Sequence, residues 1–316
     1  MMIFKFEPIY KQRIWGGTRL RDVLGRETPK ESRIGESWEV VDRKEDNSVI
    51  ANTNHKGTTL SMLLATEGKN VMGPNWQQGK PFPLLVKWLD CSQRLSLQVH
   101  PPEGVAEKLS GEPKTENWYV AEASPQAGLF IGLKAGTSPS EFINATETKT
   151  VEKLCHRVQS NKGDSVLVES GRLHAIDAGN LILEIQQNSD TTYRVYDWER
   201  KGLDGRPRTL HIEESMQCID FEDYEPSPMI TSIKNGMEVI ADSKYFRIQK
   251  FNLSKNSPEM VKEPNSGPIM IHALEGDMML NEVKIRKGEH ALCSFSTGCL
   301  ISPSEDSSVL ITDRFC

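Results

Sequence analysis

The sequence lacks several features that would assign it to common classes of protein. It has no apolar run near the length of about 20 residues that a helix needs to cross a bilayer. Its first residues carry neither a basic segment nor a long apolar core, so we expect no secretion signal. The six cysteines form no CxxC pair and no close cluster, which favours reduced thiols over disulfides or a zinc knuckle. Together these absences predict a soluble, cytoplasmic protein.

Positive charge is scarce as well. The chain carries 38 lysines and arginines against 44 aspartates and glutamates, which gives a net charge of −6. This balance argues against nucleic acid as a partner, and we expect no membrane partner either. A small anionic substrate would therefore need positive charge gathered locally in a pocket. At 316 residues the chain is long enough for two modest domains, and we expect a monomer or a weak homo-oligomer.

What the sequence does contain is a recurrent strand pattern. Short β-prone segments alternate with glycine and asparagine turns, as in 165–168, 181–187 and 193–198. Helical patterns are short, and we place them at 58–68, 138–145, 147–155 and 212–219. This rhythm predicts a mainly β protein, built as a sandwich or barrel rather than from βαβ units.

A proline-containing segment, E-P-S-P at 225–228, divides this pattern in two. We expect a first domain over residues 1–225, which carries the chemistry and the helical insertions, and a second domain over residues 229–316. The second part contains His272 and His290, but no histidine or carboxylate lies at strand spacing from either. We therefore interpret it as a structural domain without a metal site.

Residues 94–120 carry the clearest chemical signal. The first part alternates, so a strand would turn its apolar residues to one face and Gln98 and His100 to the other. Two prolines end the strand, a short helix can follow, and the chain returns to a β-prone run just after Glu116. An imidazole and an amide oxygen, with a carboxylate brought back nearby, form half of a mixed nitrogen and oxygen metal site. A structural histidine before a proline is the alternative for this segment alone.

A second histidine occupies a turn of known type. Residues 163–174 approximate the second cupin motif, in which a glycine begins a strand and a turn presents a metal-binding histidine, here His174. Glu169 stands where that motif prefers proline. Gln98 and His100 can occupy the place of the first cupin motif's His-x-His.

Five segments follow one another in a fixed order: P-F-P-L-L-V-K-W-L-D, L-S-L-Q-V-H-P, K-T-E-N-W-Y, G-R-L-H-A-I and Q-N-S-D-T-T-Y-R-V-Y-D-W. In this order they resemble the type I phosphomannose isomerases of the cupin superfamily, in their short bacterial form, over about residues 5–316. The resemblance implies two cupin-like (jelly-roll) β-barrel domains with a few short helices. It also implies an aldose-ketose isomerase of carbohydrate metabolism, which interconverts mannose 6-phosphate and fructose 6-phosphate.

The resemblance further implies a cofactor, one Zn²⁺ per chain, and a set of site residues. The metal ligands that it carries over are Gln98, His100, Glu116 and His174. The residues at catalytic positions are Arg194, Lys114 and Glu184. Those at substrate-binding positions are Lys87, Ser96, Trp15 and Glu36. Long members of the family have a glycine and a lysine after the arginine where this chain has Val195 and Tyr196, so the phosphate-binding residues are left unassigned.

These residue types suit an isomerisation that moves a proton between C1 and C2 through an enediol. Zinc held by one carboxylate and neutral ligands keeps net positive charge, which stabilises the developing enediolate. Either Glu184 or Lys114 could take the proton, and the sequence does not decide between them. Arg194 could stabilise the enediolate or assist proton transfer between its oxygens.

Other functions fit the same residues. Two histidines and one carboxylate also describe the non-haem iron site of oxygenases, a chemistry that cupin barrels can host. A cupin that binds a sugar phosphate without turnover is the second alternative. Lys87 could simply pair with an internal carboxylate, and Glu184 could orient other groups instead of acting as the base. We interpret as solvated surface, in preference to a phosphate site, the basic cluster Arg200, Lys201, Arg206 and Arg208. We interpret as exposed or structural the histidines His55, His156 and His211.

Overall fold

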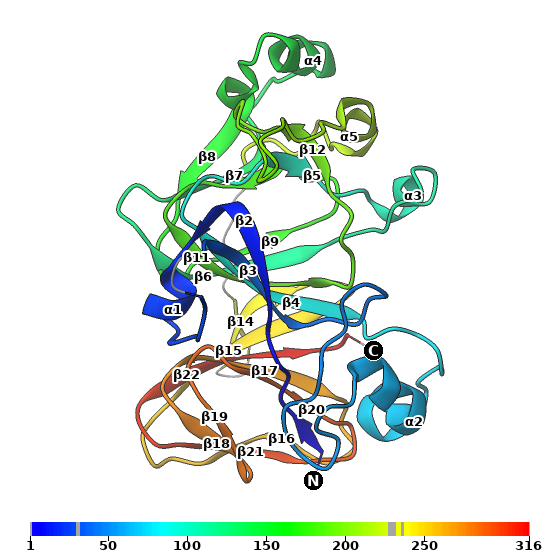
Figure 1. The fold of residues 1–316 in the computed structure, drawn as a ribbon, viewed down its shortest axis with the longest axis vertical. Helices are drawn as coiled ribbons and strands as arrows, with labels where there is room; N and C mark the ends of the chain where they lie inside the picture. Colours follow the sequence, from blue (N-terminus) through cyan, green and yellow to red (C-terminus); the bar gives the residue numbers. More distant parts are fainter. Residues whose placement is uncertain (1, 30–31, 227–231, 235–236, 316) are drawn as a thin grey trace. The chain divides into compact units, whose positions relative to one another are not determined.

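The computed structural model describes residues 2–29, 32–226, 232–234 and 237–315, and it is built mainly of strands (Figure 1). The strands are β1 (Ile3–Phe4), β2 (Ile9–Gly17), β3 (Ile34–Val40), β4 (Leu84–Cys91), β5 (Leu97–Val99), β6 (Glu116–Ala123), β7 (Gly128–Leu133), β8 (Cys155–Gln159), β9 (Ser165–Val168), β10 (His174–Ile176), β11 (Asn180–Gln187), β12 (Tyr193–Tyr196), β13 (Ser232–Lys234), β14 (Met237–Asp242), β15 (Arg247–Leu253), β16 (Glu259–Lys262), β17 (Ile269–Glu275), β18 (Met278–Leu280), β19 (Val283–Ile285), β20 (His290–Cys293), β21 (Cys299–Pro303) and β22 (Ser307–Asp313).

Helices are few and short. They are α1 (Arg19–Asp22), α2 (Leu60–Met72), α3 (Glu103–Ala106), α4 (Pro139–Glu147), α5 (Ile212–Cys218) and the 3₁₀ turn η1 (Val151–Leu154). Among the described residues, none of these helices has the length and apolar character needed to cross a membrane. The prediction of a mainly β fold is therefore confirmed.

The predicted helices meet different outcomes. α4 begins as expected, because the Ser138 side chain accepts a hydrogen bond from the backbone N–H of Glu141 and Pro139 occupies the first turn. α5 also forms where it was expected. The helix predicted over 147–155 is wrong, because only the short turn η1 forms there before the chain enters β8.

The chain divides into two compact units, and each draws on separate parts of the sequence. One unit contains 1–9, 38–86 and 230–316, and the other contains 10–37 and 87–229. Residues 227–228 of the predicted linker lie outside the described residues. The division into domains 1–225 and 229–316 stays a proposal, and the grouping of 38–86 with the C-terminal segment is the feature that it did not anticipate.

The unit with residues 87–229 is organised by two antiparallel arrangements of strands. One is a five-stranded sheet in the order β12-β5-β10-β7-β8. The other consists of β11, β6 and β9 with β2, β3 and β4, in the order β2-β3-β4-β11-β6-β9. Apolar side chains from both sheets form one buried cluster, and they include Trp118, Val120, Ile131, Val166, Ile176 and Ile182. On the other face of the five-stranded sheet, alternation turns a second set of apolar side chains, including Leu97, Val99 and Phe130, into a separate buried cluster.

The other unit has a seven-stranded sheet in the order β1-β20-β17-β22-β15-β14-β13 and a four-stranded sheet in the order β16-β21-β18-β19. Its apolar core combines both sheets, and it includes Ile271, Ala273, Met278, Leu280, Ile301 and Ile311. The helix α2 belongs to this unit and begins at Thr59, whose side chain accepts a hydrogen bond from the backbone N–H of Met62.

Two buried histidines pair inside this unit. His272 lies directly opposite His290 on the neighbouring strand, and their Nδ1 atoms are 2.8 Å apart. His272 Nε2 lies 3.0 Å from the Thr312 hydroxyl, and Glu39 Oε2 lies 3.8 Å from His290 Nε2. Complete burial lowers the pKa of His272 to about 3, so the folded protein keeps this imidazole neutral.

The buried His272 predicts a loss of stability in acid. Between about pH 6.5 and pH 3 the unfolded chain takes up a proton at this residue and the folded chain does not. The free energy of unfolding should therefore fall on acidification, by up to about 1.4 kcal/mol per pH unit from this one group. Urea denaturation at several pH values between 7 and 4 measures how steeply the free energy of unfolding depends on pH. His272→Gln should make this dependence less steep. An equal dependence in the two proteins would show that it does not come from His272.

Candidate active site

Three neighbouring strands place three of the predicted site residues in one row. Gln98 on β5 lies directly opposite His174 on β10, and it also lies opposite Arg194 on β12. Directly opposed residues of antiparallel strands turn their side chains to the same face. Leu97 and Val99 turn to the other face and are fully buried in an apolar cluster. The alternation predicted from the sequence is confirmed, and it sets the polar face of this sheet.

The second sheet contributes carboxylates to the same site. Glu116 begins β6 and lies opposite Gln186 on β11, while Glu184 lies opposite Trp118. Since 116 and 118 are two residues apart, as are 184 and 186, all four side chains share one face. Glu116 is fully buried and Glu184 is 5% exposed. Two buried acids therefore lie on one face of the second sheet.

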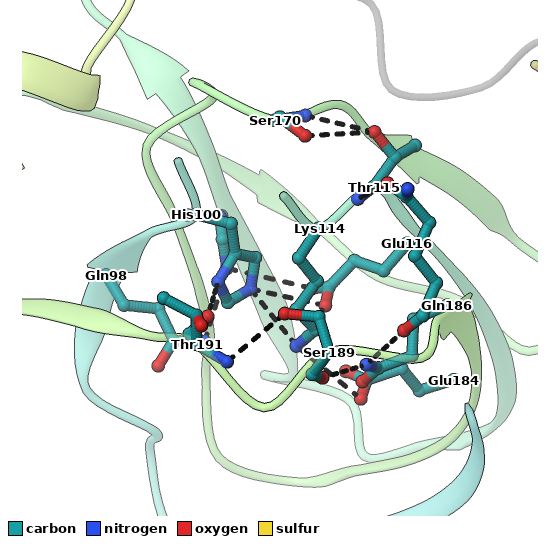
Figure 2. Close-up of polar contacts among 12 residues, drawn as sticks. Gln98, His100, Lys114, Thr115, Glu116, Ser170, Glu184, Gln186, Ser189 and Thr191 are labelled. Carbon is teal, nitrogen blue, oxygen red and sulfur yellow. Dashed lines mark hydrogen bonds and ion pairs between the residues drawn. The ribbon is translucent and has the colours of Figure 1, made fainter. Parts of the chain in front are cut away.

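His100, Glu116 and His174 converge. Their possible ligand atoms all lie within 4.8 Å of one another, and each residue is at most 1% exposed. His100 Nε2 lies 3.3 Å from one oxygen of Glu116, and His174 Nε2 lies 3.7 Å from the other. Figure 2 shows the side chains of His100, Lys114 and Glu116 directed toward one another. The sequence placed these residues in one site, and the geometry brings them together.

The backbone fixes both imidazoles with their Nε2 atoms toward Glu116. His100 Nδ1 lies 2.9 Å from the carbonyl oxygen of Thr191, and His174 Nδ1 lies 2.8 Å from that of Arg172. A carbonyl only accepts, so each Nδ1 carries the proton and donates it. Each Nε2 therefore has a free lone pair, which is the form that binds a metal ion.

Burial keeps these imidazoles neutral. It lowers the pKa of His100 to about 3, with Lys114 acting in the same direction, and it also lowers the pKa of His174. Burial alone would raise the pKa of Glu116, but the charge of Lys114 holds it well below its usual value. The cluster thus combines two neutral nitrogen donors with one ionised carboxylate.

Gln98 can complete this donor set. Its Nε2 lies 3.2 Å from His174 Nε2, and the Ser96 hydroxyl donates to its Oε1 over 3.2 Å. A half-turn of the amide points Oε1 at the cluster instead, and the Ser96 hydroxyl then accepts from Nε2, since a hydroxyl can donate or accept. Gln98 therefore offers a neutral oxygen ligand at no loss of its bond to Ser96.

The cluster fits a divalent cation. Neither oxygen of Glu116 accepts a hydrogen bond within the described part of the chain, although Lys114 Nζ lies 2.7 Å from Oε2. Lys114 Nζ also lies 3.2 Å from His100 Nε2, so an ammonium approaches the same atoms that a metal ion would use. Two imidazole nitrogens, a carboxylate and an amide oxygen are ligands of Zn²⁺ and of similar ions.

Glu184 faces the same space and is held by two neighbours. Lys87 Nζ lies 3.3 Å from its Oε1, and the Trp118 indole N–H donates to its Oε2 over 3.2 Å. Burial and the negative charge of Glu116 raise the pKa of Glu184, while Lys114 and Lys87 oppose that shift. Lys87 thus pairs with an internal carboxylate and also lines the cavity described next, so both interpretations of it hold.

A cavity of about 590 Å³ opens beside this cluster. It is lined by every residue predicted at a catalytic or substrate-binding position, namely Trp15, Glu36, Lys87, Ser96, Lys114, Glu184 and Arg194. At its edge Glu36 forms a double hydrogen bond with Arg13, with distances of 2.9 and 3.0 Å. Trp15 is 3% exposed and packs in the apolar cluster between the sheets, so it is both a core residue and part of the wall.

Part of the cavity lining is rich in arginine, and we call it the arginine wall. Arg194 and Arg208 line the cavity there, and Arg208 and Arg200 both bind the carboxylate of Asp197. The interpretation of Arg200 and Arg208 as solvated surface is wrong, because both are half-buried and pair with Asp197. Arg194 Nε is a buried donor that has no hydrogen-bond partner in the described part of the chain. This end of the cavity is suited to an anionic group.

Sequence reasoning missed three residues of this wall: Arg13, Arg208 and His211. His211 was interpreted as exposed or structural, but it lines the cavity, and its Nδ1 accepts from the backbone N–H of Arg194 over 3.2 Å. These residues come from segments with no strand spacing to the row of ligands. The excess of arginine between 194 and 208 was the only available signal.

Comparisons with known proteins agree with this geometry. Residues 3–152 match the family model for the catalytic domain of type I phosphomannose isomerase. The chain is 36% identical to mannose-6-phosphate isomerase ManA of Bacillus subtilis over 302 residues, which cover 93% of both chains. It is also 36% identical to the mannose-6-phosphate isomerase of Streptococcus mutans, over 90% of this chain and 92% of that protein.

Solved structures extend the match to the whole fold. The crystal structure of mannose 6-phosphate isomerase from Bacillus subtilis superposes with a TM-score of 0.86 and 28% sequence identity, and the match covers 99% of each chain. The expected resemblance is thus confirmed, both in sequence and in the arrangement of the strands. The chain is an enzyme that belongs to the type I phosphomannose isomerase family.

Proposed function

We propose that this enzyme interconverts mannose 6-phosphate and fructose 6-phosphate through an enediol, with one Zn²⁺ held by Gln98, His100, Glu116 and His174. The observation that carries the proposal is the convergence of two imidazole lone pairs on a buried carboxylate, beside a cavity whose lining includes arginines. Relatives that cover at least nine-tenths of the chain are named for this activity.

Zinc would supply the positive charge that stabilises the enediolate. The protein's contribution is to hold its donors rigidly. Both imidazoles are tied to backbone carbonyls, and Glu116 sits on a central strand between β11 and β9. Such outer contacts orient metal ligands and set their tautomers.

Glu184 is the residue that we assign to proton transfer between C1 and C2. Its carboxylate lines the cavity, and Lys87 and Trp118 fix its orientation. Lys114, the other candidate, is engaged with Glu116 at 2.7 Å, and the two neighbouring carboxylates raise its pKa against the effect of burial. A carboxylate that is held in place and faces the substrate is better suited to act as base than an ammonium.

The arginine wall would receive the charged parts of the substrate. Arg194 stands in the same row as Gln98, where its guanidinium can stabilise the enediolate oxygens or help a proton move between them. Arg208 also lines the cavity, and Asp197 holds it in place. We assign the phosphate to Arg208, because a planar guanidinium binds phosphate oxygens in pairs.

Three further assignments complete the proposal. The enzyme acts in the cytoplasm, as a monomer or weak homo-oligomer. Its partner is a small sugar phosphate, with no nucleic acid or membrane involved. The first 225 residues form the catalytic domain, and residues 229–316 form a partner domain without a metal site.

Loss of Glu116 should remove the metal. We expect Glu116→Gln to lower bound zinc from about one ion per chain toward zero after dialysis, because the one anionic ligand is lost. Turnover of mannose 6-phosphate should fall with it, and the wild-type enzyme treated with a chelator should regain activity on addition of Zn²⁺. Metal analysis and a coupled assay measure both quantities. Glu122→Gln is the matched control, since Glu122 lies on the same strand and pairs with Lys162 at the surface.

The same measurements separate the alternative functions. Iron in place of zinc, with consumption of O₂, would support an oxygenase. Tight binding of mannose 6-phosphate without turnover by the zinc-loaded protein would support a binding protein. Either result would overturn the proposed isomerase.

Loss of Arg194 should stop catalysis while the metal stays bound. We expect Arg194→Ala to reduce kcat by about two orders of magnitude or more, the usual effect of removing one group that stabilises transition-state charge. Zinc content should stay at the wild-type level, because no atom of Arg194 belongs to the donor cluster. Wild-type kcat in this variant would refute the role given to Arg194.

Loss of Arg208 should weaken recognition of the phosphate and leave the chemistry in place. We expect Arg208→Gln to raise KM for mannose 6-phosphate about tenfold or more, since a charge-assisted contact is lost. Turnover of unphosphorylated mannose, which offers no phosphate to Arg208, should be unaffected. Arg206→Gln provides the control, because Arg206 is an exposed residue of the same loop. An equal loss on both sugars would place the phosphate elsewhere.

A further inference from the structure

A second cavity, of about 710 Å³, lies in the same unit and shares no lining residue with the first. It is lined by Arg19, Ser92, Arg94, Ser124, Pro125, Gln126, Ala127, Arg157, Gln159, Asp177, Ala178 and Gly179. These residues come from α1, from the segment between β4 and β5, from β8, and from the turns that connect β6 to β7 and β10 to β11. The proposed isomerase uses none of them.

The charges in this cavity are unbalanced. Three guanidinium groups and one carboxylate line it, in a chain whose net charge is −6. Asp177 accepts hydrogen bonds from Arg94 and from Arg157, over 2.7 to 3.1 Å. Burial works to raise the pKa of Asp177, but these two arginines hold it below its usual value, so the carboxylate stays ionised. The lining therefore keeps an excess of two positive charges.

Carboxylates outside the lining reduce this excess only in part. Glu152 lies 2.9 Å from Arg94, at an exposed position. Asp90 lies behind Arg19 and accepts from its backbone N–H, while burial raises the pKa of Asp90 to about 6. Among the described contacts, no salt bridge joins the guanidinium of Arg19 to Glu152 or to Asp90.

Hydrogen-bond donors remain available in the cavity. Arg19 Nη2 donates to the Ser124 hydroxyl over 2.8 Å, but its Nη1 is buried and has no hydrogen-bond partner in the described part of the chain. Arg157 uses its Nε for Asp177 and its Nη2 for the carbonyl of Gln126. Ser92 is exposed at the edge. A buried, unsatisfied N–H on a charged group is costly, and a bound acceptor would remove that cost.

We propose that this cavity binds the phosphate group of a small phosphorylated molecule, with Arg19 and Arg157 as its main contacts and Ser92 at the entrance. Guanidinium groups present paired N–H donors that match phosphate oxygens. The cavity is large enough for an organic group beyond the phosphate. A neutral sugar would leave the excess positive charge unmatched, so the phosphate is the recognised part.

The cavity lies next to the metal ligands along the chain. Asp177 follows His174 by three residues, and Arg94 precedes Gln98 by four. Leu95 and Ser96 line the first cavity, while Ser92 and Arg94 line the second, so a single short segment separates the two. An anion bound at the arginines that hold Asp177 would therefore lie close to the ends of β5 and β10, the strands that carry Gln98 and His174.

Direct binding measurements test this site on the zinc-loaded enzyme. Isothermal titration with inorganic phosphate and with glycerol 3-phosphate should show a binding event in the wild type that weakens about tenfold or more in Arg19→Gln/Arg157→Gln. Any phosphate bound in the catalytic cavity is common to both proteins, so the difference reports the second cavity. Binding of the ester identifies an organic phosphate as the ligand, and binding of inorganic phosphate alone identifies the free ion.

Two further variants keep the test decisive. Ser92→Asp adds a carboxylate at an exposed position without disturbing the arginines, and it should weaken the same event. Arg21→Gln, on the same helix but outside the cavity, should bind as the wild type does. Turnover of mannose 6-phosphate should stay at the wild-type level in all variants. Unchanged binding in Ser92→Asp and in the double variant would overturn the proposal, whichever sugar the enzyme isomerises.

Discussion

The burial of the Glu116 carboxylate is the constraint on which the site depends. An ionised carboxylate with no exposed surface costs several kcal/mol unless a cation lies close to it. The imidazoles of His100 and His174 cannot supply that charge, because burial keeps them neutral and their protons go to backbone carbonyls. The positive charge must come from Lys114 or from a bound metal ion. The site is therefore built to hold a cation, and its neutral ligands leave that cation's charge available to a substrate.

The register of the strands explains how distant residues reach this carboxylate. One sheet aligns Arg194, Gln98 and His174 across three strands, and the other places Glu116 and Glu184 on its inner face. A shift of one residue in any of these pairings would turn the side chain into the apolar face. The fully buried Leu97 and Val99 oppose such a shift, because it would expose them. The apolar core thus fixes the position of the polar site.

The features of the fold and the site that follow from local sequence patterns could be predicted. Alternation around Gln98 and the order of the motifs were sufficient for the strand, the fold class and the convergence of the ligand set. Gly68 shows the limit of such patterns: it was expected to end a helix, but α2 continues to Met72. The glycine is needed for packing instead, since a Cβ at 68 would lie 2.4 Å from the ring of Trp76. The burial of Arg208 and the position of His211 in the cavity lining were also not predicted. Their burial depends on Asp197 and on backbone contacts that no spacing in the sequence reveals.

The two cavities have the same arrangement of charges beside them: in each case, two arginines share one aspartate. Asp197 holds Arg200 and Arg208 beside the first cavity, and Asp177 holds Arg94 and Arg157 beside the second. Sharing one carboxylate orients both guanidiniums and still leaves a net positive charge for a ligand. The two clusters also touch, because Arg200 donates to the backbone carbonyl of Arg94. A continuous chain of contacts therefore links the two arginine pairs, from Asp177 through Arg94 and Arg200 to Asp197 and Arg208.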